Sequence, residues 1–239
     1  MAGAEHGEHA AWMRGAVAWA ARVVFPEVCA GCGVTGTWMC AECAARCVVI
    51  NPQTSCQRCG NPDARATMCR RCQGWPSALS MARGVYLFDG PIRDAVYRLK
   101  YGDEHARAAW GGDALARLFD GLGWQPTLLV PTPLHPRRRR QRGYNQSEKL
   151  AQALSARVGI PTANALERLR DTRPQVGLTA DDRLRNVAGA FATRLRLDGH
   201  GVLLIDDVLT TGSTLLDCAR ACRAGGALDV RALTVAMGN

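Results

Sequence analysis

The segment from Val202 to Thr214 carries the residue types best suited to chemistry. It consists of a short apolar strand, two adjacent carboxylates, and a run of hydroxyl residues around one glycine that precedes a helix. Open α/β sheets bind ligands at the carboxyl edge of their strands, and the free N–H groups at a helix start attract phosphate. Paired carboxylates suit vicinal hydroxyls or a hydrated Mg²⁺. We therefore expect a ribose-phosphate site at Asp206, Asp207, Thr210, Thr211, Gly212, Ser213 and Thr214. The alternative is an acidic turn before a capped helix.

Eight of the eleven cysteines form four Cys-x-x-Cys pairs. Each such turn directs two thiolates to one point, so two turns complete a tetrahedral zinc site. A disulfide framework is the alternative, and it belongs to secreted proteins. We expect no secretory signal, because Arg22 interrupts the apolar run 15–25 and no basic start precedes it. Pairing neighbours in sequence is one arrangement, and the spacing also allows a crossed one. We expect two structural Zn²⁺ sites with the ligands Cys29, Cys32, Cys40, Cys43, Cys56, Cys59, Cys69 and Cys72.

Alternating strand and helix patterns must position these residues. Short apolar runs separated by helical patterns indicate a parallel α/β sheet with flanking helices. Strands are expected at 83–88, 128–130, near 166, near 191, at 202–205 and at 230–236. Helices are expected at 92–100, 104–122, 144–158 and 213–224. The resulting organisation is an N-terminal tail and helix (1–25), a double zinc-ribbon module (26–80) and an α/β domain (81–239).

Composition and charge restrict the function further. The chain has 239 residues, of which 47% are hydrophobic and 21% charged, so most of it should fold. No apolar stretch reaches the roughly 18 to 20 residues of a membrane helix, and we expect no membrane span. The formal net charge is +9, and residues 134–149 hold six basic side chains against the single acidic Glu148. The arginine run 137–142 is either a solvated basic loop or a contact for diphosphate or nucleic acid, with Tyr144 beside it for stacking.

Several motifs together resemble one protein family. The segment 202–214 resembles the ribose-phosphate signature of type I phosphoribosyltransferases. The cysteine-rich module is similar to that of the ComF family, and the resemblance covers nearly all of residues 22–237. Further segments that match this family are Leu99–Tyr101, Val130–Arg138, Arg142–Gln146, Thr172–Gln175, Leu178 and Arg185–Val187. The resemblance implies a type I phosphoribosyltransferase-like domain in a cytoplasmic protein linked to natural competence and DNA uptake in bacteria.

The same resemblance implies roles for individual residues. Asp206 and Asp207 would hold the ribose hydroxyls and the Mg²⁺ of 5-phosphoribosyl 1-diphosphate (PRPP), and residues 210–214 would wrap its 5-phosphate. A basic loop with Leu134, His135, Arg137 and Arg138 would lie against the diphosphate. The segment 170–186 would be a mobile loop that closes over the site, with the candidate residues Arg173, Gln175, Arg183, Arg185 and Asn186. No residue is identifiable from the sequence as a general base.

Three hypotheses for the function follow. The first is a Mg²⁺-dependent phosphoribosyltransferase with a structural zinc module. The second is a non-catalytic module that binds single-stranded DNA and retains a ribose-phosphate pocket. The third is a structural partner of a competence helicase. A homodimer is a candidate assembly for any of them.

Overall fold

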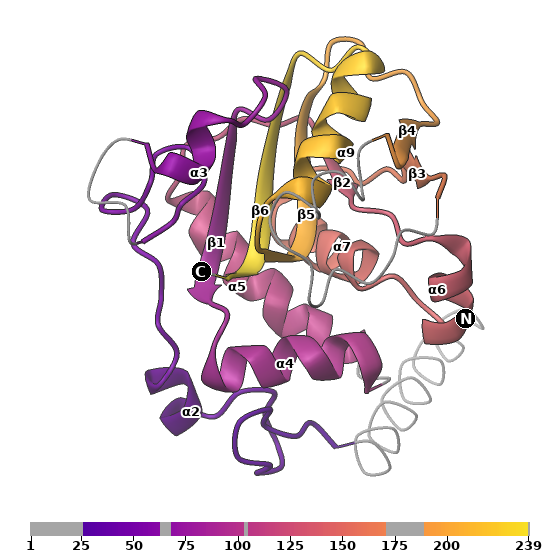
Figure 1. The fold of residues 1–239 in the computed structure, drawn as a ribbon. Helices are drawn as coiled ribbons and strands as arrows, with labels where there is room; N and C mark the ends of the chain where they lie inside the picture. The colour runs from indigo at the N-terminus through magenta and orange to yellow at the C-terminus, as the bar shows by residue number, and fades with distance from the viewer. Residues whose placement is uncertain (1–25, 63–67, 103–104, 171–188, 239) are drawn as a thin grey trace, which may run out of the picture.

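The computed structural model describes residues 26–62, 68–102, 105–170 and 189–238. The expected N-terminal helix and nearly all of the expected mobile loop lie outside these residues. The described chain forms a parallel β-sheet with helices on both faces, which confirms the predicted fold class (Figure 1). Among the described helices, none is both long and apolar enough to cross a lipid bilayer.

The central sheet has the strand order β1-β6-β5-β2, and its strands are β1 (Met81–Leu87), β2 (Leu128–Pro131), β5 (Gly201–Leu209) and β6 (Asp229–Met237). All three pairings are parallel, so the carboxyl ends of the strands share one edge. The two central strands are almost wholly buried, which explains the apolar run 202–205 of β5 and the largely apolar sequence of β6. Strand β5 extends beyond the predicted end at residue 205, because Asp206 pairs in register with Thr234 of β6.

One face of the sheet is covered by α4 (Gly90–Tyr101), α5 (Ala108–Asp120) and α7 (Gln146–Val158). Their apolar side chains share a buried core with the side chains of the sheet on this face. Helices α5 and α7 approach closely because residue 112 is glycine: a Cβ there would lie 2.4 Å from the Cβ of Ala153. The helix predicted for 104–122 is shorter, since a 3₁₀ turn, η1 (His105–Arg107), precedes α5.

The opposite face is covered by α9 (Ser213–Ala224) and by a small antiparallel pair, β3 (Leu166–Arg168) and β4 (Phe191–Thr193) (Figure 1). The two short strands lie where the sequence predicted strands, but they pair with each other and do not join the parallel sheet. The buried carboxylate of Asp217 on α9 accepts hydrogen bonds from the N–H groups of Gly189, Ala190 and Phe191. Asp217 thereby fixes the start of β4 on the helix.

The cysteine-rich segment contains two short helices, α2 (Ala41–Ala45) and α3 (Arg70–Gln73), and packs on the α/β domain at two places. Its first half shares a core with Ile92, Ala95 and Val96 of α4. Its second half shares the large core beneath α9. Between the halves, residues 48–50 run beside the edge strand β1, where Ile50 N–H donates to the carbonyl of Val85 at 2.9 Å. This segment therefore covers an edge that would otherwise expose unpaired backbone groups.

Candidate functional site

A cavity of about 460 Å³ lies at the carboxyl ends of β2 and β5, where ligands bind in sheets of this kind. The structure brings together in its wall six of the residues predicted for the site, Leu134, Arg138, Asp206, Asp207, Thr210 and Thr214. Seven further residues line the cavity: Phe88, Lys100, Thr132, Pro133, Gln146, Arg168 and Val208. Asp206 and Asp207, the loop 210–214 (the phosphate-type loop) and Arg138 thus line the same cavity.

Asp206 is held in a buried hydrogen-bond network. Its Oδ1 accepts from the Oγ of Ser147 at 2.8 Å and from the N–H of Asp207 at 2.9 Å, and Thr132 Oγ1 donates to Ser147 Oγ at 3.0 Å. The Asn145 side chain caps α7 at Ser147 N–H, which places Ser147 beside β5. Burial raises the pKa of Asp206 to about 6, and the neighbouring charge of Asp207 adds to the increase. The side chain is therefore close to titration at physiological pH.

Asp207 forms an ion pair with Lys100 from the last turn of α4, with Lys100 Nζ 3.0 Å from Asp207 Oδ1. Burial on its own would lower the pKa of Lys100, but the charges of Asp207 and Asp206 raise it above its ordinary value. Lys100 therefore stays protonated beside the two carboxylates. Lys100 was not predicted as a site residue, although it is one of only two lysines in the chain.

The loop 210–214 joins β5 to α9, and Gly212 is the N-cap residue of that helix. Thr210, Gly212, Ser213 and Thr214 line a small cavity of about 30 Å³, which shares Asp206 with the larger one. Thr211 does not line either cavity; its Oγ1 lies 3.1 Å from the Oγ of Ser213 and helps to shape the turn. The helix start and the hydroxyls thus surround a space of the kind that binds a phosphate.

Two features of the structure require glycine at position 212. Its φ is +83°, a conformation that residues with a side chain rarely adopt. In addition, a Cβ at this position would lie 2.5 Å from the ring of Trp75. Trp75 is buried and belongs to the cysteine-rich segment, so this contact joins the two parts of the chain at the loop.

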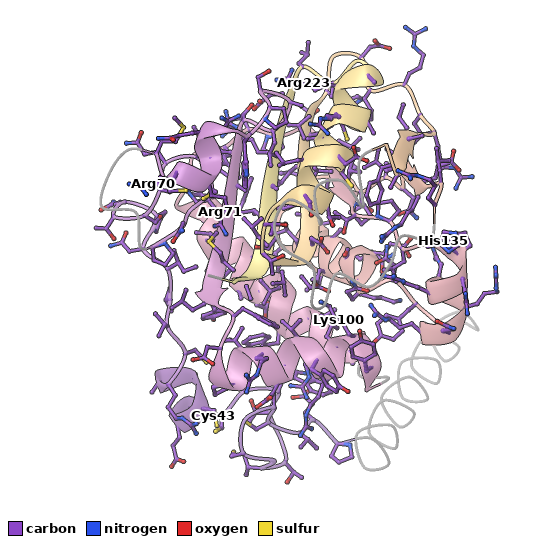
Figure 2. All side chains as sticks on the ribbon, viewed as in Figure 1. Cys43, Arg70, Arg71, Lys100, His135 and Arg223 are labelled. Carbon is purple, nitrogen blue, oxygen red and sulfur yellow. The ribbon has the colours of Figure 1, made fainter. Side chains whose placement is uncertain are left out.

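The basic segment differs from the prediction of a loop. Residues 136–142 form helix α6 (Pro136–Arg142), capped by His135, whose Nδ1 accepts from Arg137 N–H at 3.4 Å. Successive residues of a helix point in different directions, so the consecutive arginines do not form one cluster. Only Arg138 lines the cavity, while the exposed Arg139 pairs with Glu148 at 2.7 Å. His135 and Arg137 do not line it. Figure 2 labels His135 at the start of α6 and Lys100 on α4.

The predicted mobile-loop residues Arg173, Gln175, Arg183, Arg185 and Asn186 lie outside the described residues. The adjoining Arg168 on β3 is described, and it lines the cavity with its guanidinium 5.3 Å from the ring centre of Phe191. Sequence reasoning did not identify Arg168, Ser147 or Thr132. Arg168 and Ser147 belong to no motif, and Thr132 lies in the segment Val130–Arg138 without a recognisable role of its own. Only the fold brings Ser147 to Asp206 and Arg168 to the cavity wall.

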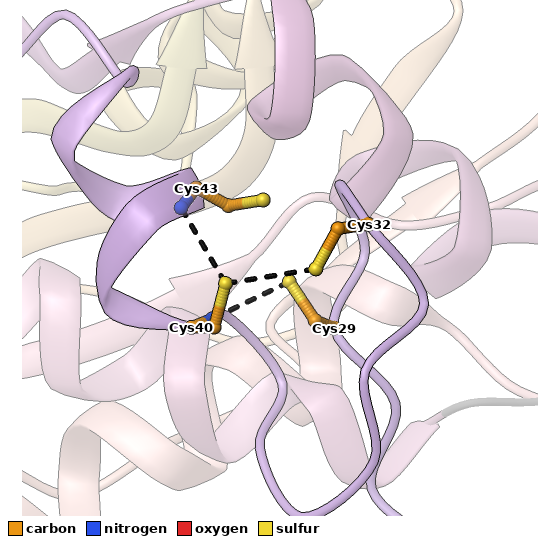
Figure 3. Close-up of side chains that lie close together, drawn as sticks. All are labelled: Cys29, Cys32, Cys40 and Cys43. Atoms are coloured by element: carbon orange, nitrogen blue, oxygen red, sulfur yellow. Dashed lines mark hydrogen bonds between the residues drawn. The ribbon is translucent and has the colours of Figure 1, made fainter.

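The cysteines form two clusters, each made from neighbouring pairs in sequence, so the crossed arrangement is not adopted. The thiols of Cys29, Cys32, Cys40 and Cys43 lie within 4.8 Å of one another (Figure 3), and so do those of the other four predicted ligands. Four thiolates converging on one point match the donor set of structural zinc. The hydrogen bond from Cys72, together with one from Arg71, lowers the pKa of Cys59 to about 4, which favours the thiolate that a metal requires.

The thiols of the remaining three cysteines belong to neither cluster. Cys218 and Cys222 on α9 are buried, and the thiol of Cys47 donates to the carbonyl of Cys43. None of the described cysteines forms a disulfide.

The acidic pair also fits a divalent cation. Asp207 Oδ2 is buried and has no hydrogen-bond partner among the described residues. A buried carboxylate oxygen without a donor is unusual, and a hard cation takes oxygen ligands of this type. Asp206 and Asp207 are therefore the residues that would hold Mg²⁺, directly or through water.

Comparisons with known proteins show which proteins the chain resembles. A model of the family described as "Phosphoribosyl transferase domain" matches residues 144–239. The chain is 33% identical over 204 residues to "DNA utilization protein YhgH" of Salmonella typhimurium, covering 81% of this chain and 87% of the relative. It is 28% identical over 205 residues to "Competence protein ComFC" of Bacillus subtilis, covering 82% and 83% of the two chains. Among solved structures, a glutamine PRPP amidotransferase from B. subtilis is similar over 56% of this chain and 29% of its own, at 18% identity and a TM-score of 0.39.

Proposed function

The chain belongs to the ComF family of competence and DNA utilization proteins with a phosphoribosyl transferase domain, and on that premise we propose that it binds PRPP with Mg²⁺ and acts as a phosphoribosyltransferase in DNA uptake. The observation that carries the proposal is the single cavity that Asp206, Asp207, Thr210, Thr214 and Arg138 line together. In this proposal Thr210 and Thr214 match the 5-phosphate of PRPP, Asp206 and Asp207 match its ribose hydroxyls, and Arg138 matches its diphosphate.

The chain's own groups have distinct tasks in this proposal. The N–H groups at the start of α9 and the hydroxyls of Thr210 and Thr214 bind the 5-phosphate. Asp206 and Asp207 accept hydrogen bonds from the ribose hydroxyls. Mg²⁺, when bound, neutralises charge on the diphosphate as it leaves. The Arg138 guanidinium offers paired N–H donors to the same diphosphate oxygens. Its positive charge stabilises the negative charge that develops on the diphosphate.

Lys100 and Ser147 keep the carboxylates in place. Lys100 holds Asp207 through a 3.0 Å ion pair, and Ser147 holds Asp206 through a 2.8 Å hydrogen bond. Both carboxylates are thereby oriented before a ligand arrives, so that little reorganisation is needed on binding. Pre-orientation of this kind favours binding of the ribose in one position.

Calorimetric titration of the zinc-loaded protein with PRPP and Mg²⁺ tests the proposal. We expect binding by the native chain, none by the Asp206→Asn/Asp207→Asn double variant, and unchanged binding by the Asp120→Asn control, whose carboxylate is exposed at the end of α5. Absence of binding by the folded native protein would refute the proposed function. If PRPP binds, release of diphosphate in the presence of candidate acceptors distinguishes an enzyme from a module that only binds.

A specific surface supports a second candidate function, binding of single-stranded nucleic acid. Tyr97 and Tyr101 on α4 are 64% and 65% exposed, and their ring centres are 4.9 Å apart. The Arg142 guanidinium lies 4.9 Å from the Tyr101 ring centre, next to the exposed arginines of α6. Exposed aromatic rings beside a basic helix are the features on which unpaired bases stack and a phosphate backbone binds.

The salt dependence of binding tests this second candidate. Affinity for an oligothymidylate should fall with salt at a log–log slope of about −0.7 for each phosphate contacted. Replacing Arg137, Arg139 and Arg140 by Ala should flatten the slope, whereas replacing Tyr97 by Ala should weaken binding with little change in slope. A slope that the arginine variant leaves unchanged would exclude α6 from such an interface.

A further inference from the structure

The second cysteine cluster is joined to the phosphate-type loop by one arginine. Arg71 lies between Cys69 and Cys72 on α3, and its Nη1 donates to the carbonyl of Thr210 at 2.8 Å. Its Nη2 donates to the thiol of Cys59 at 3.7 Å. The same guanidinium therefore contacts a cluster thiol and the backbone of the loop 210–214, across 139 positions of sequence.

A second contact from the same segment supports the loop from another point. Trp75 follows Cys72 by three positions, is 7% exposed, and packs on Gly212 so closely that a Cβ there would lie 2.5 Å from its ring. Gly212 is the N-cap of α9 and has a positive φ. The ring thus fills the space behind the turn from which the first N–H groups of α9 emerge.

The cluster itself determines where these two side chains lie. Cys56, Cys59 and Cys72 have no exposed surface, and they belong to the same core as Leu209 and Leu215 on either side of the loop. Arg58 adds hydrogen bonds to the carbonyls of Cys72 at 3.1 Å and Pro76 at 2.8 Å. The chain from 69 to 76 is therefore fixed at both ends. The first cluster packs instead on α4.

We propose that Arg71 and Trp75 are positioning residues for the 5-phosphate site, so that the second cysteine cluster is a working part of that site and not only a fold-stabilising module. The inference rests on the proposed function for the identity of the ligand, but the mechanical link between α3 and the loop does not depend on it. A donor to the Thr210 carbonyl holds the strand end, and the Trp75 ring holds the turn. Together they fix the direction of the amides and hydroxyls that receive a phosphate.

Hydrogen–deuterium exchange of the zinc-loaded full chain tests the link without any ligand. The variants are Arg71→Gln, Arg71→Lys, and Arg70→Gln as the matched control, because Arg70 is the exposed neighbour on the same short helix (Figure 2). Loss of a charged hydrogen bond typically permits about tenfold more opening. We expect about tenfold faster exchange at amides 211–216 in Arg71→Gln, partial protection in Arg71→Lys, and native exchange in the control. Native exchange at these amides in Arg71→Gln would overturn the inference.

Calorimetry of the same variants separates positioning from general damage. Ribose 5-phosphate without Mg²⁺ probes the phosphate loop, whereas inorganic diphosphate with Mg²⁺ probes the opposite wall of the cavity. Arg71→Gln should weaken ribose 5-phosphate binding by about tenfold and leave diphosphate binding unchanged. An equal loss for both probes would indicate a merely structural role and overturn the inference. If the native chain binds neither probe, the proposed function fails, and the exchange experiment still decides whether Arg71 holds the loop.

Discussion

Replacing Asp206 by Asn should stabilise the ligand-free protein while abolishing the proposed binding of PRPP. Asp206 is 9% exposed, and burial raises its pKa from 3.8 to about 6. The ionised side chain is therefore less favourable in the folded chain than in the unfolded one. The difference of roughly two pH units corresponds to about 3 kcal/mol at neutral pH. Asn carries no charge, and its Oδ1 can accept both hydrogen bonds that reach Asp206 Oδ1.

The sign of the effect follows from proton linkage. The folded state holds the Asp206 proton more tightly than the unfolded state does, so stability is greatest below the unfolded pKa and falls as the pH rises toward 6. Asp206→Asn removes this dependence. We expect a gain in the free energy of unfolding of up to about 3 kcal/mol at pH 8, and roughly half of that at pH 5.

Urea unfolding at pH 5 and pH 8, with zinc present and Mg²⁺ absent, measures the gain. Asp207→Asn is the matched control, because it leaves Lys100 without its partner at 3.0 Å and should destabilise the fold by about 1–3 kcal/mol. Adjacent carboxylates thus have opposite effects. A lower stability of Asp206→Asn than of the native chain at pH 8 would refute this prediction, and so would an equally large gain in stability at pH 5.

Three further predictions follow from the site. Affinity for PRPP with Mg²⁺ should fall by about tenfold for each pH unit below about 6, because protonated Asp206 no longer attracts a cation. Calorimetry between pH 5 and 8 measures this dependence, and an affinity that does not change with pH would contradict the prediction. Gly212→Ala should destabilise the fold by about 1–3 kcal/mol, because the added Cβ would be strained by the positive φ and would press on the ring of Trp75. A free energy of unfolding in urea equal to that of the native chain would exclude this. The native protein should contain two zinc ions per chain, and a chelator should lower its melting temperature. A metal content near zero in freshly purified, folded protein would be inconsistent with the two sites.

Much of the fold was predictable because its signals are local. The strands of the parallel sheet contain short apolar runs, such as 128–130 and 202–205, and α7 and α9 lie close to their predicted positions. The basic helix α6 was not predicted, because it has no apolar face: none of its residues is buried. Its helical form depends on the His135 cap and on Gly143 at the end, which an apolar pattern does not reveal.

The division into a cysteine-rich module (26–80) and an α/β domain (81–239) stays a prediction, and the structure adds how the two parts pack. The sequence suggested a separate cysteine-rich unit, since metal can replace the core that a segment of this size is unable to build alone. In the structure the second cluster lies in the core beneath α9, and the buried Arg107 donates to the carbonyls of Val28 and Trp38 beside the first cluster. Both halves depend on the α/β domain for burial.

The sequence by itself determined those chemical features whose residues are close neighbours in the chain. The Cys-x-x-Cys spacing fixes which thiols can converge, and the order strand, Asp206, Asp207, hydroxyl loop, helix fixes a phosphate-type turn beside an acidic pair. The tertiary structure alone decided which distant side chains complete the site. Lys100 reaches Asp207, and Arg71 reaches Thr210, through packing of segments more than a hundred positions apart. Such contacts arise from the burial of whole helices and strands, and no local pattern encodes them.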